Sequence, residues 1–395
     1  NKFYEINLKY NKKKLLKKIR ATNTKNFKPY VVFHGKKFFY KDQIWFMIRI
    51  GSRKITKNNY PYLIAEIGVN HNGSIHIAKK LIDFALRAGF DAVKFQTYNL
   101  DGLLKKNTPL VQYQRTDSKI KNMYNLLKKY SLTYGEFEKI KKYCEKKKIT
   151  FLSTPFDLES AKFLNKINVQ AFKISSSDND NYLLLDLVKK FKKPIILSTG
   201  MSNNFEINKT IKHLSLPKSK LALLHCISDY PTKLSETQLY NILNLKKYGY
   251  CYGLSDHSVG IYSSIVALTL GSTIIEKHIT LDKHMKGPDH SASLEVSKIN
   301  DYVKNIKDIH ISLLKKEKFL TSSEILNKNF AKKSLYFKNK LKKNDIIKKN
   351  DIIVLRPRLN GVTPDNFEKI LGKKVARDIK SLEIISKDKI KNWKN

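Results

Sequence analysis

Eight short apolar segments, each followed by polar residues, constrain the fold more than any other feature of this 395-residue chain. The expected strands are Leu63–Ile67, Ala92–Gln96, Thr150–Ser153, Ala171–Ile174, Ile195–Ser198, Leu221–His225, Cys251–Leu254 and Ile274–His278. They are continuously apolar rather than alternating, which is typical of parallel strands buried on both faces. Amphipathic helical patterns such as Ile75–Ala88 and Ser258–Leu270 separate most of them. Eight β/α units over about 220 residues match the size of one (β/α)8 TIM barrel.

A doubly wound parallel sheet is the main alternative α/β fold, but no GxGxxG motif follows any of these strands. We predict an N-terminal extension at residues 1–50, a barrel domain at 51–314, a charged linker at 315–329 and a small unit at 330–395. The small unit contains two short strand patterns. About 60 residues is marginal for independent stability, so we expect this unit to dock on the barrel or on a partner subunit.

The extension carries only weak patterns. Lys9–Lys18 is predicted to be helical, and Tyr30–Phe33 and Gln43–Ile48 are predicted to be two strands around a turn at Gly35–Lys37. These patterns assign no role to the extension.

The net charge is +43, which raises the possibility of nucleic-acid binding. The lysines are spread over nearly every segment, however, and no RNA-binding motif, zinc-finger spacing or groove-binding basic helix is present. We therefore expect no nucleic-acid partner and interpret the charge as a compositional bias that favours solubility. No apolar run approaches the roughly 18–20 residues of a membrane span, and three cysteines without CxxC spacing fit a reducing, cytoplasmic compartment.

Polar residues follow every expected strand, and a barrel would gather all eight strand ends around one mouth. Two lysines and several hydroxyl groups among them suit a phosphate and a carboxylate: Lys94, Lys173, Ser153, Thr154, Ser176 and Ser198. His225 and His257 have ring nitrogens that suit a divalent metal ion, with Glu66 nearby. The eighth end brings Glu276, Lys277 and His278, to which no separate role is assigned. Any one of these residues alone would be read as turn chemistry or surface charge.

Together the strand-end motifs resemble the sialic acid synthases, which include the N-acetylneuraminate, legionaminate and pseudaminate synthases. The resemblance covers about residues 50–390 and rests on ordered motifs: Ala65–Gly73, Val93–Thr97, Leu152–Phe156, Phe172–Asp178, Ile196–Met201, Leu224–Cys226, Tyr230–Thr232, Gly253–His257, Glu276–His278 and Gly287–Glu295. The C-terminal unit resembles the antifreeze-like SAF domain, a small β-clip-like fold, that these synthases carry.

The resemblance implies a transferase that condenses phosphoenolpyruvate with a 2-acetamido hexose to give a nine-carbon 2-keto sugar acid and phosphate. It implies that His225 and His257 hold a divalent metal, Mn with Mg or Co as alternatives, and that Glu66 holds a metal-bound water or moves a proton. The positions that match phosphoenolpyruvate binding are Lys94, Thr154, Lys173, Ser176 and Ser198, and those that match sugar binding are Gln96, Asp178, Tyr230, Asp289 and Arg356.

The resemblance also implies a homodimer in which the SAF domain of one subunit covers the barrel mouth of the other and supplies Arg356 to the acetamido group of the sugar. Asp178 stands where many relatives have Glu, and Ser228-Asp229 stands where others have Asn or Ser pairs. The Pro288–Glu295 segment is more like the neuraminate and legionaminate synthases than the pseudaminate synthases.

Three other interpretations stay open on the sequence alone. A Schiff-base pyruvate aldolase or lyase could use Lys94 or Lys173, although the many hydroxyls favour phosphate binding. A nucleic-acid-binding protein would leave the strand-end residues unexplained. The SAF unit could bind sugar by itself. The sequence does not identify the acceptor hexose, the metal or the role of residues 1–50.

Overall fold

The computed structural model describes residues 30–33, 36–39, 47–111, 120–314 and 317–393. Two compact units are present, Asn1–Leu314 and Lys315–Asn395, and each is described by itself. The predicted helix Lys9–Lys18 lies outside the described residues. Within the described ranges, no helix combines the length and apolar character needed to cross a bilayer.

The first unit contains a closed barrel of eight parallel strands. These are β5 (Tyr62–Gly68), β6 (Ala92–Thr97), β7 (Thr150–Pro155), β8 (Phe172–Ile174), β9 (Ile195–Ser198), β10 (Leu221–His225), β11 (Cys251–Asp256) and β12 (Ile274–Thr280). Neighbours in sequence are neighbours in the sheet, and pairing of β12 with β5 and with β11 closes the circle. This confirms the predicted TIM barrel. Each predicted strand lies at the predicted place; β5, β6, β7, β11 and β12 extend one or two residues further, and β8 begins one residue later.

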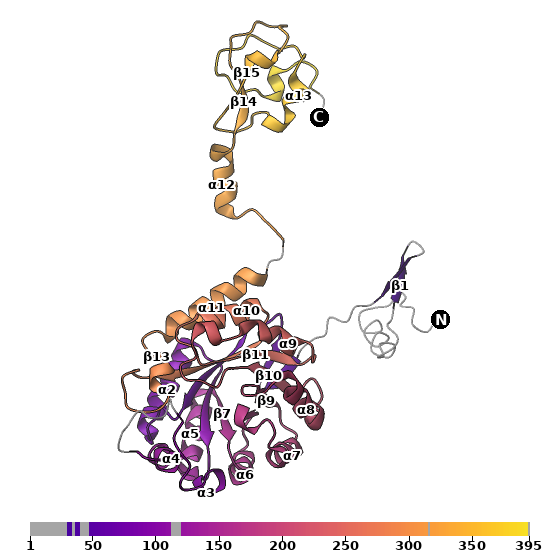
Figure 1. Cartoon of the computed structure of the whole chain (residues 1–395). Coiled ribbons are helices and arrows are strands. Elements are labelled where there is room, and N and C mark those ends of the chain that lie inside the picture. Colours follow the sequence, from indigo (N-terminus) through magenta and orange to yellow (C-terminus); the bar gives the residue numbers. More distant parts are fainter. Residues whose placement is uncertain (1–29, 34–35, 40–46, 112–119, 315–316, 394–395) are drawn as a thin grey trace. The chain divides into compact units, whose positions relative to one another are not determined.

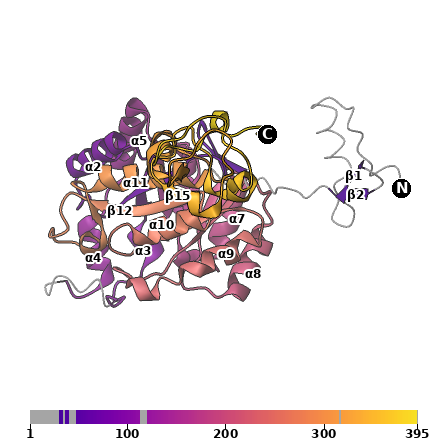
Figure 2. The same ribbon diagram turned by 90° about the horizontal axis from the view of Figure 1, so that it is seen from above.

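Helices surround the strands, as Figures 1 and 2 show. They are α2 (Ile75–Ala88), α3 (Leu100–Leu103), α4 (Met123–Tyr130), α5 (Tyr134–Lys147), α6 (Leu158–Lys166), α7 (Tyr182–Lys190), α8 (Asn204–Leu214), α9 (Ile242–Lys246), α10 (Tyr262–Thr269) and α11 (Ile299–Leu314). Each crossover therefore packs an apolar helix face onto the sheet, which is why the strands are buried on both sides.

The ends of α2 illustrate how local sequence sets these helices. Ser74 caps the N-terminus by accepting a hydrogen bond from the Ile77 backbone N–H. Gly89, with φ of 92°, ends the helix in the left-handed region, where a side chain would be strained. Between them Ala78, Leu81, Ile82 and Ala85 form the buried face at helical spacing.

The strands β11 and β12 come unusually close at one point. Gly253 on β11 pairs in register with Ile274 on β12, and a Cβ atom at Gly253 would overlap the Ile274 carbonyl oxygen. A glycine is therefore required for these two strands to pair here. His257 directly follows β11, and His278 lies near the C-terminal end of β12.

An antiparallel hairpin, β3 (Met47–Ile50) and β4 (Arg53–Thr56), packs on the barrel core before β5 begins. Ile48 and Ile50 precede the predicted start of the barrel domain at residue 51, yet both are fully buried in its core. Arg53 pairs with Asp91, whose other carboxylate oxygen accepts a 2.8 Å hydrogen bond from the Leu63 backbone N–H.

One predicted hairpin is wrong in its pairing. β1 (Tyr30–Phe33) pairs with β2 (Lys36–Phe39), so Lys36 and Lys37, predicted as a turn, are strand residues. The predicted second strand, Gln43–Ile48, is described only from Met47, where β3 begins. Two residues join β1 to β2, a connection short enough for adjacent antiparallel strands.

The second unit is a small β-rich fold, as predicted. β14 (Ser334–Phe337) pairs with β15 (Ile352–Leu355), and isolated antiparallel bridges join further segments. Its core consists of Leu335, Phe337, Ile347, Val362, Ile370, Val375, Ile379, Ile385 and Ile390, with α13 (Phe367–Ile370) alongside. α12 (Ser322–Ala331) occupies much of the stretch predicted as a linker; a capping box of Thr321 and Glu324 begins this helix.

Candidate active site

The period of two along each strand turns alternate residues to the inside of the barrel. Nine of the predicted site residues line one cavity at the C-terminal ends of the strands: Glu66, Lys94, Gln96, Thr154, Lys173, Ser176, Ser198, Tyr230 and His257. Lys94 and Gln96 on β6 lie two residues apart, as do Ser255 and His257 at the end of β11. The cavity is thus the mouth of the barrel, where active sites of this fold lie.

Two lysines and two glutamates form a buried network in this cavity, each 4% exposed or less. The Nζ of Lys94 lies 2.9 Å from the Oε2 of Glu66. Both Lys94 and Lys173 place Nζ 3.7 Å from the Oε1 of Glu276. The ammonium and carboxylate charges therefore compensate one another. Without such a partner, a buried charge would be strongly destabilising.

Hydroxyl groups complete the surroundings of the two ammonium groups. Lys173 donates to the Ser198 Oγ at 2.6 Å, and Lys94 donates to the Thr154 Oγ1 at 3.2 Å. On the wall beside them, the Gly200 backbone N–H donates to the Ser176 Oγ at 2.9 Å. Cations flanked by hydroxyl and amide donors can bind phosphate and carboxylate oxygens.

The two carboxyl groups have opposite pKa shifts. Burial raises the pKa of Glu66 to about 7, and this effect outweighs the attraction of Lys94. Burial also acts on Glu276, but Lys173 and Lys94 outweigh it and lower its pKa. Glu276 therefore stays ionised near neutral pH while Glu66 can hold or release a proton, a property of a general acid or base.

The pKa values of the two lysines are also shifted in opposite directions. Burial lowers the pKa of Lys173. Burial also disfavours the charged form of Lys94, but Glu276 and Glu66 outweigh it and raise its pKa. Lys94 is thus held firmly as a cation beside the titratable Glu66.

A pair of histidines lies at the rim of this network. The His257 and His278 rings have centroids 5.5 Å apart with an interplanar angle of 66°, and Tyr230 contacts both rings. The His257 Nδ1 lies 2.6 Å from the Ile227 carbonyl oxygen, so Nδ1 carries the proton and Nε2 presents a lone pair. Burial lowers the pKa of His257 to about 4 and the pKa of His278 well below its usual value, so both rings are neutral.

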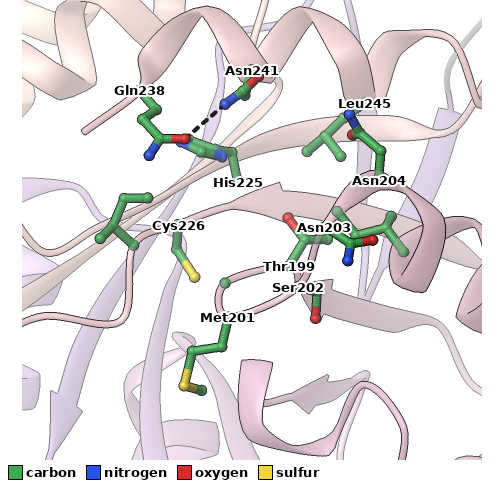
Figure 3. Close-up of a pocket in the computed structure, with 13 residues that line it drawn as sticks. Thr199, Met201, Ser202, Asn203, Asn204, His225, Cys226, Gln238, Asn241 and Leu245 are labelled. Atoms are coloured by element: carbon green, nitrogen blue, oxygen red, sulfur yellow. Dashed lines mark hydrogen bonds between the residues drawn. The ribbon is translucent and has the colours of Figure 1, made fainter. Parts of the chain in front are cut away.

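His225, the predicted partner of His257, does not line this cavity. It lines a neighbouring cavity of about 390 Å³ (Figure 3), and its Nε2 donates to the Thr237 carbonyl oxygen at 2.8 Å. The strand register explains this: His225 pairs with Leu254, the residue before the inward-facing Ser255, and so shares the outward face of the sheet. The neighbouring cavity has no Lys, Arg, Asp or Glu in its lining, although it is larger than the charged cavity of about 70 Å³.

Four other predicted residues lie outside the cavity lining. Ser153 precedes the cavity-lining Thr154 on β7, and its Oγ lies 2.7 Å from the Thr97 Oγ1. Asp289 is close by, with its Oδ2 3.9 Å from the His278 Nδ1, and burial raises its pKa to about 6. Asp178 accepts a 2.9 Å hydrogen bond from Asn181 just after β8, and burial raises its pKa. Arg356 belongs to the second unit, where it is exposed directly after β15.

Glu276 and His278 are the residues to which the sequence analysis assigned no role. Both are on β12 and two residues apart, so the same period of two that collects Lys94 and Gln96 could have assigned them to the inner face. The Ser255 Oγ donates to the Glu276 Oε1 at 2.7 Å, which ties β11 to β12 on that face.

Comparisons with known proteins show which family the chain belongs to. The NeuB family model matches residues 81–318 and the SAF domain model matches residues 332–391. The chain is 37% identical to the N,N'-diacetyllegionaminic acid synthase of Campylobacter jejuni, covering 82% of this chain and 98% of that protein. It is 32% identical to the pseudaminic acid synthase of the same species, covering 81% and 93%.

A solved structure is also similar. It is the N-acetylneuraminic acid (sialic acid) synthetase from Leptospira borgpetersenii in complex with citrate, with 33% identity, a TM-score of 0.64, and coverage of 72% of this chain and 95% of that one. The family model spans more than half of the chain, and the relatives align over nearly their whole length. On this evidence the chain belongs to the NeuB family of sialic acid-type synthases, with a SAF domain after its barrel.

Proposed function

We propose that this chain condenses phosphoenolpyruvate with an N-acylated amino hexose to give a nine-carbon 2-keto sugar acid and inorganic phosphate. The observation that carries the proposal is the buried pair of ammonium groups, Lys94 and Lys173, set among hydroxyls beside two carboxyl groups at the barrel mouth. The names of the similar synthases support the same reaction class.

In the proposed reaction, C3 of the enol attacks C1 of the open-chain aldehyde, and the positive charge that develops is at C2. Water adds to C2, and the tetrahedral intermediate expels phosphate by cleavage of its C–O bond. Lys94 and Lys173, with Ser198, Thr154 and Ser176, would hold the phosphate and carboxylate oxygens. Glu66, with its pKa of about 7, would accept a proton from the attacking water and pass it to the former aldehyde oxygen, which becomes a hydroxyl. The proton of the new C2 hydroxyl leaves with the phosphate as the keto group forms.

Two histidines are suited to bind a divalent metal ion, but they are not the pair that the sequence predicted. We propose His257 and His278 as the ligands, because their rings lie together and His225 faces the other side of the sheet. The His278 Nδ1 is buried and has no hydrogen-bond partner among the described residues. Such a metal would polarise the aldehyde oxygen when bound.

Imidazole nitrogens favour Mn or Co over Mg. Within the described ranges no group of three or more His, Cys, Asp or Glu side chains is arranged around a metal position. Two protein ligands would leave the remaining positions to substrate and water, as in catalytic rather than structural sites.

We propose N-acetylmannosamine or 2,4-diacetamido-2,4,6-trideoxymannose as the acceptor, with the pseudaminate precursor as the alternative. Gln96 lines the cavity and donates to Glu66 at 3.5 Å, and Asp289 lies near His278; both suit sugar hydroxyls. The experiment measures phosphate release from phosphoenolpyruvate with Mn²⁺ and each sugar separately, with and without chelator. Release with one sugar that chelator abolishes supports the proposal; release with none of the three sugars contradicts it.

The lowered pKa of Lys173 favours one competing function, a Schiff-base pyruvate lyase, because a neutral amine is the nucleophile in that chemistry. Borohydride reduction in the presence of pyruvate would trap such an adduct. A mass increase on Lys173 would favour the lyase, and an unmodified protein that still releases phosphate from phosphoenolpyruvate would exclude it.

We further propose a homodimer in which the SAF domain of each subunit supplies Arg356 to the barrel of the other. Arg356 is exposed in its own unit, and its planar group can donate to an acetamido oxygen. Mixing inactive Arg356→Ala protein with inactive His257→Gln protein would form heterodimers with one intact site. Recovered activity supports the swap, and a mixture that stays inactive contradicts it.

A further inference from the structure

A buried ion pair on the outer face of the barrel lies directly behind the two histidines. The Asp256 Oδ2 and the Lys277 Nζ are 2.9 Å apart, and each side chain is 1% exposed. The two residues pair in register as the last recorded rung between β11 and β12. The preceding rung, Ser255 with Glu276, faces the cavity, so the ion pair faces the helices.

Every polar atom of this pair has a partner. The Asp256 Oδ1 accepts hydrogen bonds from the Ser258 backbone N–H at 2.9 Å and from its Oγ at 2.6 Å. The Asp256 Oδ2 also accepts from the Ser264 Oγ at 2.7 Å, and Lys277 donates to the Ser258 carbonyl oxygen. Ser264 lies 2.7 Å from the Tyr302 hydroxyl, so the network joins both strands to α10 and α11.

This network costs desolvation that a well-packed apolar pair in the same place would not cost. Apolar packing would hold the strands together without a directional requirement, whereas the ion pair and its hydrogen bonds fix the position of each backbone. Asp256 and Lys277 are the residues directly before His257 and His278. A shift of either residue would therefore move the ring that follows it.

We propose that Asp256 and Lys277 are positioning residues that set the separation and tilt of the His257 and His278 rings. The centroid distance of 5.5 Å and the angle of 66° are the geometry that they maintain. The role of the two rings as metal ligands rests on the proposed function, but their geometry does not.

The test uses the double variant Asp256→Asn/Lys277→Met, because it leaves no unpaired buried charge. Its matched control is Arg53→Met/Asp91→Asn, which removes another ion pair of the same unit at the opposite ends of the strands. Three quantities are measured on the full chain: the urea midpoint of unfolding, the Kd for Mn²⁺ by titration, and the imidazole ¹⁵N signals of His257 and His278 without metal.

The expected result is that the Asp256/Lys277 double variant shifts both imidazole signals and raises the Kd for Mn²⁺ about tenfold or more. The Arg53/Asp91 control should lower the urea midpoint without changing either of the other readouts. The proposal would be overturned if the Asp256/Lys277 double variant kept both the wild-type imidazole signals and the wild-type Kd for Mn²⁺.

The two proposals fail in different ways. If the wild-type protein itself binds no Mn²⁺, the metal part of the proposed function is wrong. The imidazole signals then decide the positioning proposal alone: unchanged signals in the Asp256/Lys277 variant overturn it, and shifted signals that the control lacks support it.

Discussion

The raised pKa of Glu66 predicts a specific pH dependence of stability that the substitution Glu66→Gln should remove. The Glu66 carboxyl is 1% exposed, and its pKa in the folded chain is about 7 against 4.5 for an ordinary glutamate. A group whose folded-state pKa is raised contributes stability that is fully present below the unfolded pKa and is lost as the pH rises through the folded pKa. Glutamine cannot ionise, so the variant lacks this loss.

The magnitude follows from the two pKa values. Ionising Glu66 in the folded protein costs about 3 kcal/mol once the pH exceeds 7, since each pKa unit is worth 1.36 kcal/mol. Most of this loss, roughly 2–3 kcal/mol, develops between pH 5 and pH 8. The free energy of unfolding of the wild type should therefore fall by that amount relative to Glu66→Gln over this range.

The assay is urea unfolding of both proteins at pH 5, 6, 7 and 8, followed by far-ultraviolet circular dichroism, which reports on the barrel helices. The control is Glu145→Gln, the same chemical change at an exposed residue paired with Lys141 on α5. An exposed ion pair contributes little to stability. The free energy of unfolding of this variant should therefore change with pH in parallel with that of the wild type. If the wild-type and Glu66→Gln curves are also parallel between pH 5 and 8, the assignment of a raised pKa to Glu66 is refuted.

Three further predictions concern the site and the barrel. Lys173→Met should raise the KM for phosphoenolpyruvate roughly ten- to a hundredfold, because hydrogen bonds to a charged group are lost; an unchanged KM would exclude Lys173 from binding it. His278→Gln should weaken Mn²⁺ binding at least about tenfold while His225→Gln leaves it unchanged, and the opposite result in a titration would restore the sequence-based pair. Gly253→Ala should lower the free energy of unfolding by about 3 kcal/mol, since its Cβ would overlap a carbonyl of the next strand. The control is Gly135→Ala, which should change the urea midpoint little because a Cβ there meets open space. Similar losses of stability in the two variants would show that the strands move apart to relieve the overlap at residue 253.

The barrel could be predicted from sequence because its strands are buried on both faces, which produces short continuous apolar runs such as Ile195–Ser198. The cavity followed from the same pattern, since parallel strands bring their C-terminal ends together. Lys94 and Lys173 are far apart in the sequence, yet each lies within 3.7 Å of one oxygen of Glu276.

The histidine pair could not be chosen by strand order. β11 is a neighbour of both β10 and β12, so either His225 or His278 could stand beside His257. The direction of each side chain decides the matter, and that direction depends on register. His225 pairs with Leu254 on the outer face, whereas His278 lies two residues after the inward-facing Glu276.

The strand pairing near the N-terminus was missed for a different reason. Lys36 and Lys37 read as turn residues by composition, but they pair with Val32 and Phe33 in the hairpin. Strand propensity depends on the neighbouring strand more than on the residue itself, so a short polar strand gives little signal. α12 was not predicted because the stretch was interpreted as a linker from its charge, and the capping box of Thr321 and Glu324 at its start was not considered.

The charges inside the barrel mouth cancel: two ammonium groups face two carboxyl groups. While Glu66 is ionised and no metal ion is bound, these four groups present no net positive charge to an entering polyanion, and protonation of Glu66, with its pKa of about 7, leaves one positive charge. Binding of such a ligand is therefore linked to proton uptake, and the heat of binding should vary with the ionisation enthalpy of the buffer. Anion affinity then falls as the pH rises, for a reason internal to the barrel and independent of the +43 charge of the whole chain.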